Sequence, residues 1–77
     1  MKALGRSDVR NPVLALSSAP ALRALPPDVR IVLRSILLDL SRDANDRASL
    51  AWARKKAPMA AYWKACSVYA KHIARAL

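Results

Sequence analysis

Hydrophobic residues are densest between Pro26 and Leu40, where they occupy two opposite sides of a predicted helix. At about 100° per residue, Arg30 and Arg34 hold its open polar sector. The two prolines at its start and the acid that follows them are typical of a first helical turn. A helix that is apolar nearly all round is usually buried from more than one side. We therefore predict that this helix is the centre of a small domain.

The polar segment SRDANDR follows Leu40 and leaves two possibilities open. One is a single helix that bends and continues to Ala57. The other is a break near positions 41 to 43, where Ser41 and Asp43 could each cap a new helix. No Gly or Pro interrupts the segment, which favours the continuous helix.

Positions 58 to 76 show the clearest helical periodicity in the chain, and Pro58 is suited to the first turn. The predicted inward face consists of Met59, Tyr62, Cys66, Tyr69, Ile73 and Ala76. The opposite face holds Lys64, Val68, Lys71 and Arg75. This alternating three-four spacing predicts an amphipathic helix packed along one side.

Positions 11 to 25 contain two helix-start signals, an Asn-Pro pair at 11 and a Ser-Ala-Pro sequence at 18. They predict two short helical pieces broken by prolines. Their expected anchors are Leu14, Leu16, Leu22 and Leu25. We expect this arm to cover the side of the central helix that carries Ile31 and Leu38, and residues 1–10 to be flexible.

Composition supports an all-α fold, because the 77 residues include one Gly, no Phe and many alanines. We predict one domain over residues 1–77, a small three- to four-helix domain with a proline-broken N-terminal arm. Its principal helices are expected at about 27–41, 43–57 and 58–76, the first two being either separate or joined in one helix. A chain this short has a thin core, which is compatible with a homodimer.

Charge is distributed unevenly, with a net value of +9. All five acids lie in the first 46 residues, and the segment from Arg47 to Leu77 has seven bases and no acid. Such asymmetry suits a phosphate backbone or an acidic protein surface. The single cysteine, Cys66, excludes an internal disulfide and agrees with a reducing, cytoplasmic location. No run approaches the roughly 20 apolar residues of a membrane span.

The residues that could support catalysis or metal binding form weak patterns. Cys66 and His72 fall on different sides of the last helix, so they do not suggest a nucleophile–base pair. Asp39 and Asp43 are better explained by local ion pairs with Arg42 and Arg47 than by a metal site. We therefore expect no enzyme activity, no cofactor and no metal.

Aromatic residues flank a basic cluster, a combination that can stack bases and contact phosphates. The candidate binding residues are Arg47, Trp52, Arg54, Lys55, Lys56, Trp63, Lys64, Lys71 and Arg75. They suggest a module that binds DNA, RNA or a nucleic-acid-processing complex. The last two helices could also form a helix-turn-helix, with residues 60 to 76 as the recognition helix.

The alternative function is a protein-interaction module, for example an inhibitor of a host defence complex that docks on an acidic protein surface. The Ala and Arg bias resembles the composition of small proteins from GC-rich bacteria, phages and mobile elements, in agreement with this class. One contiguous basic stripe would favour nucleic acid. Divergent bases beside an exposed apolar patch would favour a protein partner or self-association.

Overall fold

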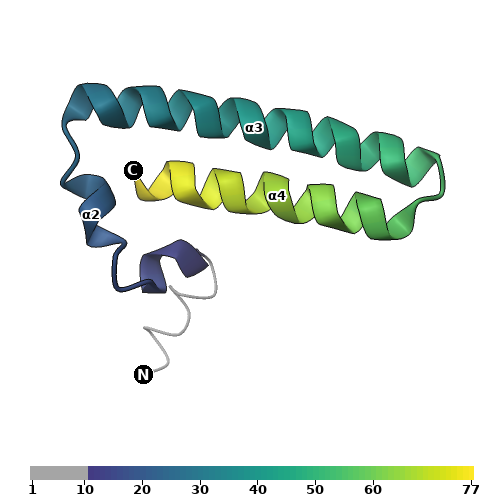
Figure 1. The fold of residues 1–77 in the computed structure, drawn as a ribbon, viewed down its shortest axis with the longest axis horizontal. Helices are drawn as coiled ribbons and strands as arrows, with labels where there is room; N and C mark the ends of the chain where they lie inside the picture. The colour runs from purple at the N-terminus through teal and green to yellow at the C-terminus, as the bar shows by residue number, and fades with distance from the viewer. Residues whose placement is uncertain (1–10) are drawn as a thin grey trace.

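The computed structural model describes residues 11–77, which form two long helices and a short N-terminal arm (Figure 1). The arm contains a 3₁₀ turn, η1 (Pro12–Ala15), and a one-turn helix, α2 (Pro20–Arg23). The long helices are α3 (Pro27–Ala53) and α4 (Ala57–Ala76). There is no strand within residues 11–77, and the all-α prediction is confirmed for this part of the chain. The flexibility predicted for residues 1–10 lies outside the described residues.

Helix α3 is continuous, so the two helices expected at 27–41 and 43–57 are one element. The polar segment after Leu40 stays helical because nothing in it breaks the backbone, and its charged residues pair along the helix surface. Asp43 accepts a bond from the Nε of Arg47 at 2.8 Å.

The helix ends at Ala53, four residues earlier than the sequence suggests. Lys55 adopts a left-handed conformation with φ 61°, and its N–H donates to the carbonyl of Trp52 at 3.0 Å. The N–H of Lys56 donates to the carbonyl of Ala51 at 2.8 Å. These two bonds make a Schellman motif, which reverses the chain without the usual glycine.

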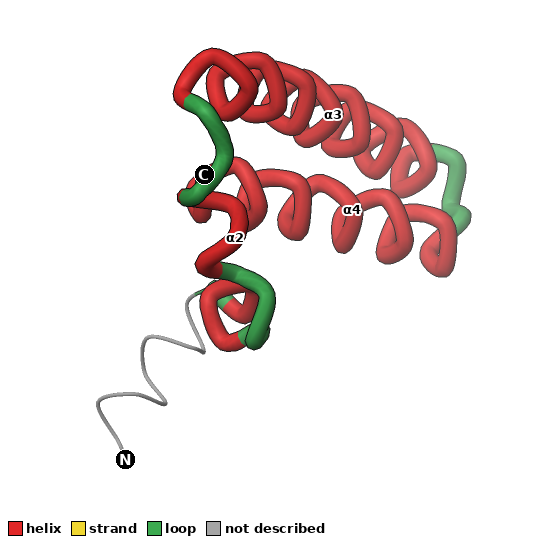
Figure 2. Tube along the Cα trace, turned by 60° about the vertical axis from the view of Figure 1, so that its left-hand side comes forward, coloured by secondary structure: helices red, strands yellow, loops and turns green. Residues whose placement is uncertain are grey.

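Helices α3 and α4 run antiparallel and side by side in both views (Figures 1 and 2). The seam between them is built from buried small residues: Ser41, Ala44, Ala48 and Ala51 of α3, and Ala60, Ser67, Ala70 and Ala74 of α4. Ala44, at the middle of the seam, is 0% exposed. Small side chains place the two helix backbones close together, so the bulky residues lie outside the seam.

Two serines pair across the seam. The hydroxyl of Ser67 donates to the carbonyl of Ser41 at 2.7 Å, and the hydroxyl of Ser41 donates to the carbonyl of Ser67 at 2.8 Å. Their two Oγ atoms are 3.1 Å apart. The reciprocal bonds satisfy both buried hydroxyls and define which turn of α3 faces which turn of α4.

The sequence-based assignment of buried faces is only partly right for both long helices. Five bulky residues of the first half of α3 are 40% to 58% exposed: Val29, Ile31, Val32, Ile36 and Leu40. Leu33, Leu37 and Leu38 are half-buried. Arg30 and Arg34 are half-buried instead of forming an open sector, because they continue the seam row that contains Ser41. In α4, Met59, Tyr62 and Tyr69 are exposed and the adjacent alanine row faces inward.

The turn η1 packs against α4 on the side away from α3, and α2 lies at the end of the hairpin beside the C-terminus (Figure 1). Asn11 caps η1 by accepting a bond from the N–H of Val13, and its Nδ2 donates to the carbonyl of His72 at 3.0 Å. The Nε of Arg23 donates to the carbonyl of Ala76 at 3.3 Å. The two short pieces were predicted correctly, but the expected cover over Ile31 is absent.

The anchors of the arm also differ from those expected. Val13 and Ala19 are buried, whereas Leu14 and Leu16 are exposed. Leu22 is half-buried and lines an apolar recess with Tyr69 of α4. The arm therefore covers one end of α4 and leaves the broad sides of the hairpin open.

The described structure is flat. Its Cα atoms extend over 41 × 35 × 14 Å, and its radius of gyration is 14.5 Å. A compact chain of this length would have a radius near 11 Å. Within residues 11–77, no large side chain is fully buried. The α3–α4 hairpin is thus one layer of helices, whereas stable domains usually pack two.

Candidate functional site: two flanks of the hairpin

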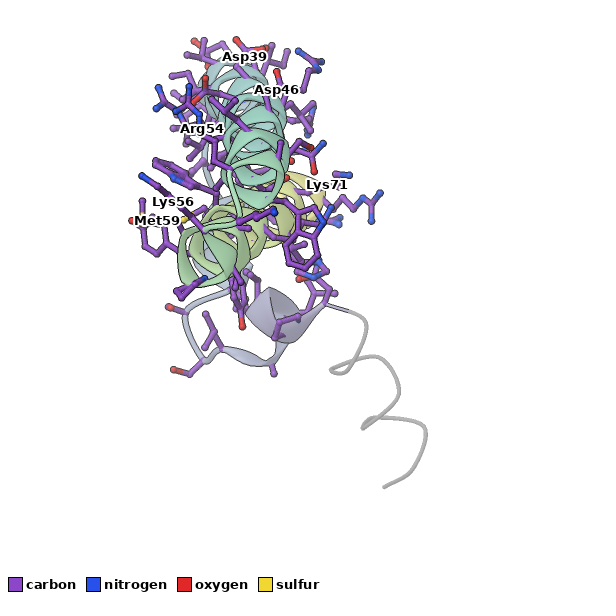
Figure 3. All side chains as sticks on the ribbon, turned by 90° about the vertical axis from the view of Figure 1, so that its right-hand side faces the viewer. Asp39, Asp46, Arg54, Lys56, Met59 and Lys71 are labelled. Carbon is purple, nitrogen blue, oxygen red and sulfur yellow. The ribbon has the colours of Figure 1, made fainter. Side chains whose placement is uncertain are left out.

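The two broad sides of the α3–α4 hairpin differ in chemistry. Figure 3, viewed from the turn end, shows Arg54, Lys56 and Met59 on one side and Lys71 on the other. Asp39 and Asp46 lie along the outer edge of α3. Residues seven apart on a helix lie on nearly the same side, so each labelled residue locates a row.

Two rows of α3 lie on the side of Arg54: Leu33, Leu40, Arg47 and Arg54, and Val29, Ile36, Asp43 and Leu50. In α4, Met59 and Cys66 share that side. We call this side the apolar flank; its apolar side chains are Val29, Leu33, Ile36, Leu40, Leu50, Met59, Tyr62 and Cys66. Six of the eight are 40% to 58% exposed, and Leu33 and Cys66 are half-buried.

The centre of the apolar flank holds a charged pair covered by an aromatic ring. Arg47 binds Asp43, and its guanidinium lies 5.1 Å from the ring centroid of Trp63 on α4. The ring of Tyr62 packs edge-on against Trp63, with centroids 5.2 Å apart. The pair has no net charge, and a guanidinium over an indole face offers a flat, weakly hydrated surface. The middle of the flank is therefore nearly neutral.

The opposite side carries a groove between the helices, which we call the basic flank. Its cations are Arg42, Lys64, Lys71 and Arg75, and Leu38, Asn45, Val68 and His72 complete the groove. Arg42 binds Asp39 at 3.0 Å, and the Nζ of Lys64 donates to Asn45 Oδ1 at 3.0 Å. Both contacts are at exposed positions, where they contribute little to stability. Arg42 and Lys64 can therefore exchange these partners for the phosphate or carboxylate of a ligand.

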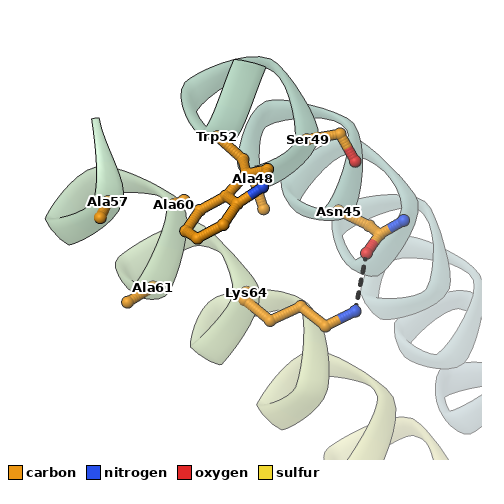
Figure 4. A pocket seen from close by; sticks show the side chains of 8 residues that line it. All are labelled: Asn45, Ala48, Ser49, Trp52, Ala57, Ala60, Ala61 and Lys64. Atoms are coloured by element: carbon orange, nitrogen blue, oxygen red, sulfur yellow. Dashed lines mark hydrogen bonds between the residues drawn. The ribbon is translucent and has the colours of Figure 1, made fainter. Parts of the chain in front are cut away.

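A shallow depression lies beside the basic flank, near the turn (Figure 4). Trp52 overhangs a floor of alanines, and Lys64 stands at the edge with its bond to Asn45. The indole of Trp52 is 69% exposed, the highest value among the large apolar side chains of the described residues. With a volume of about 460 Å³, the depression is large enough for one flat ring.

The nine predicted binding residues therefore do not form one surface. Lys64, Lys71, Arg75 and Trp52 lie together along the basic flank. Arg47 and Trp63 contact each other on the apolar flank. The cluster from Arg54 to Lys56 occupies the turn between α3 and α4. Arg54 and Lys56 lie towards the apolar flank (Figure 3).

The candidate site also includes residues that sequence reasoning missed. Arg42 joins the basic flank from the acid-containing half of the chain, because the antiparallel hairpin brings it to the groove that Lys64 and Lys71 line. Ile36 and Leu40 were interpreted as core and instead belong to an exposed surface. A signal was available, since small residues recur with three-four spacing at positions 41, 44, 48 and 51.

The helix-turn-helix hypothesis is wrong. That motif sets two helices at a wide angle with the second free to enter a groove. Here α4 lies antiparallel along α3 over its whole length (Figures 1 and 2). Ser67, in the middle of the supposed recognition helix, is buried in the seam.

The two predicted ion pairs, Asp39 with Arg42 and Asp43 with Arg47, are confirmed. Cys66 lies on the apolar flank and His72 on the basic groove, so the two do not face each other. Residues 11–77 bring no three His, Cys, Asp or Glu side chains together as metal ligands would be. Neither long helix has a stretch sufficiently long and apolar to span a bilayer, within the same part of the chain.

These features define a class of structure: an antiparallel helical hairpin with a small-residue seam, an apolar flank and a basic flank. No family model, curated protein or solved structure matches the chain. Its function is therefore inferred from the two flanks alone.

Proposed function

We propose that this chain is a non-enzymatic interaction module that packs its apolar flank against helices of a protein partner. The observation that carries the proposal is the inverted placement of side chains, with alanine and serine in the seam and the bulky residues outside. The six exposed apolar side chains present on the order of 600 Å² to solvent, the upper limit of the patch found on a typical monomer. Apolar patches of this size are often functional, which supports a role for the flank in binding another chain.

The composition of the flank indicates what sort of partner it suits. Its aromatic, methionine and arginine side chains are the types enriched in the centres of protein interfaces. The central pair of Asp43 and Arg47 is neutral, so the flank suits an apolar helix surface better than a strongly acidic one. The rows of side chains on α3 and α4 form ridges and grooves, into which the side-chain ridges of a partner helix can pack.

Site-specific photo-crosslinking tests this proposal. A benzophenone amino acid placed at Tyr62 on the apolar flank should form protein adducts in cells that make the chain. The matched position is Val68 on α4, which lies on the basic groove. Protein adducts at Tyr62 but not at Val68 support the proposal. Equal yields at both positions, or none at Tyr62, contradict it.

A second candidate function is binding of single-stranded nucleic acid along the basic flank. The specific support is that Lys64, Lys71 and Arg75 follow one groove that leads to the exposed indole of Trp52. A base stacked on an exposed aromatic ring, with its phosphates along a basic track, is the common mode of such binding.

Titration of labelled single-stranded DNA, duplex DNA and RNA at about 50 and 200 mM salt tests this candidate. Four phosphate contacts to a single strand predict a loss of roughly 50-fold in affinity between the two salt concentrations. Trp52→Ala should weaken binding to single strands, whereas Trp63→Ala on the other flank should leave it unchanged. Weak binding at the lower salt, or equal effects of the two substitutions, would argue against the basic flank as a site.

A further inference from the structure

We infer that the occupant of the apolar flank is a second copy of this chain, packed face to face as a two-fold four-helix bundle. This inference rests on the proposed function and names its partner. A single layer 14 Å thick becomes a two-layer domain when two copies meet through their apolar flanks. The bulky residues of both copies would then form the core that the hairpin lacks.

The area of the flank agrees with a dimer. The exposed apolar side chains of one copy present on the order of 600 Å², and a stable interface buries about 800 Å² per partner including its polar rim. Leu33, Cys66 and the flat Arg47–Trp63 contact contribute further surface.

The pattern of α3 is self-complementary. Leu40 is the central residue of Pro27–Ala53, so a two-fold axis crossing α3 there brings Leu40 against Leu40 of the second copy. The same axis places Val29 of one copy at the level of Leu50 of the other. Large apolar residues thus oppose one another at the middle and at both ends of the interface.

Charge favours the arrangement in which the two turns lie at opposite ends. Each turn carries the adjacent cations Arg54, Lys55 and Lys56, and a bundle with both turns at one end would bring six cations together. The opposite arrangement separates them by the length of the bundle. It also leaves both basic flanks on the outside, so Arg42, Lys64, Lys71 and Arg75 of each copy lie away from the interface.

Sedimentation equilibrium of the purified full chain, from about 5 to 500 µM, measures the association. Ile36 and Ile31 form a matched pair, because both are on α3 with exposures of 57% and 58%. Ile36 belongs to the apolar flank, whereas Ile31 lies one heptad before Leu38 of the basic flank. Ile36→Glu should weaken dimerisation at least 100-fold, and Ile31→Glu should change it less than threefold. The helical circular dichroism of each variant at high concentration reports whether it still folds.

The orientation is tested by pulsed electron spin resonance, with a label at Ala53→Cys in a Cys66→Ser background. Turns at opposite ends place the two labels about 39 Å apart along the bundle, from 26 residues at 1.5 Å each. Labels that are less than half as far apart would overturn the orientation.

The outcomes separate this inference from the proposed function. A dimer that Ile36→Glu disrupts and Ile31→Glu does not supports the inference. A monomer at every concentration overturns it, and adducts between Tyr62 and a different protein would then leave the proposed function in place. A monomer combined with no adduct at Tyr62 overturns both. A dimer equally sensitive to both substitutions shows that the contact lies elsewhere.

Discussion

The seam and the apolar flank of the hairpin reverse the usual arrangement of a small domain. The seam is buried and contains alanines and two serines, whereas the flank is open and contains leucine, isoleucine, valine, methionine and tyrosine. Burial of alanine contributes little hydrophobic free energy, since the term scales with the apolar area removed from water. The seam therefore determines how α3 and α4 fit together, and the flank holds six of the thirteen large apolar side chains that are exposed within residues 11–77.

This difference is what we expect if the hairpin supplies half of a core. Close approach through small residues lets two helix backbones pack tightly, and it leaves many bulky side chains exposed outside the seam. A chain of 77 residues has little other means to build a core. Its stability should consequently depend on what covers the flank.

Enlarging a side chain in the seam should cause the largest loss of folding stability. Ala44→Leu inserts a bulky side chain at a position with 0% exposure and should destabilise the fold by about 3 kcal/mol, because the helices must separate. Urea unfolding followed by circular dichroism measures the change. Ala53→Leu, at an exposed position of α3, is the control and should change stability by less than about 0.5 kcal/mol. Similar effects at both positions would mean that the seam is not tightly packed.

Truncating a large side chain of the apolar flank should cause the next largest loss of stability. The loss is expected only when a partner chain covers the flank. Leu40→Ala should cost about 2 kcal/mol per chain at high protein concentration, as in a buried core. Ile31→Ala, at an exposed position on the other flank, should cost less than about 0.5 kcal/mol. Thermal unfolding at two concentrations differing 100-fold measures both, and the wild-type Tm should rise with concentration. A Tm independent of concentration, with equal costs for the two variants, would show that the flank stays exposed.

The two seam serines, Ser41 and Ser67, should each contribute a smaller amount to stability. Ser67→Ala removes the bond that the Ser67 hydroxyl donates to the carbonyl of Ser41 and should cost about 1 kcal/mol. Ser41→Ala should cost a similar amount for the same reason. The double variant should cost less than the sum through the contact between the two Oγ atoms, 3.1 Å apart, since each hydroxyl otherwise donates to a backbone carbonyl that persists in every variant. Strict additivity in a double-mutant cycle would show that the two serines act independently.

The smallest effect is expected from the backbone conformation of Lys55 in the turn. Lys55 holds φ 61° at a position where glycine is normally found. Lys55→Gly should stabilise the hairpin by up to about 1 kcal/mol, measured by urea unfolding, while leaving the dimer affinity unchanged. Lys56→Gly, at a residue with negative φ, should destabilise instead. Stabilisation by both glycines would mean that the left-handed turn is not the cause.

Local signals in the sequence were sufficient for the helices and the arm. Proline positions correctly placed the starts of η1, α2, α3 and α4, and the spacing of opposite charges predicted both ion pairs. The end of α3 was missed because a lysine takes the left-handed position that a glycine usually marks. No propensity rule identifies such a residue, since the turn is imposed by the packing of α4 against α3.

The buried faces could not be predicted by searching for the largest hydrophobic side chains. Periodicity correctly showed that Met59, Tyr62 and Cys66 share one side of a helix, but it cannot say what that side faces. In a chain that completes its core with another chain, the most hydrophobic stripe belongs to the interface. The basic flank was half predicted, because Lys64, Lys71 and Arg75 follow one helix while Arg42 reaches them only through the fold.

Small-angle X-ray scattering of the purified chain reports mass and thickness together. It therefore tests whether two hairpins pack face to face through their apolar flanks. If two hairpins bury their apolar flanks against each other, the scattering mass is twice 8.4 kDa and the 14 Å Cα thickness grows by one helix layer, about 8–10 Å. Both values should revert to those of one hairpin in Ile36→Glu and persist in Ile31→Glu. A mass of 8.4 kDa with the dimensions of a single layer, at every concentration of the wild-type chain, would contradict the account.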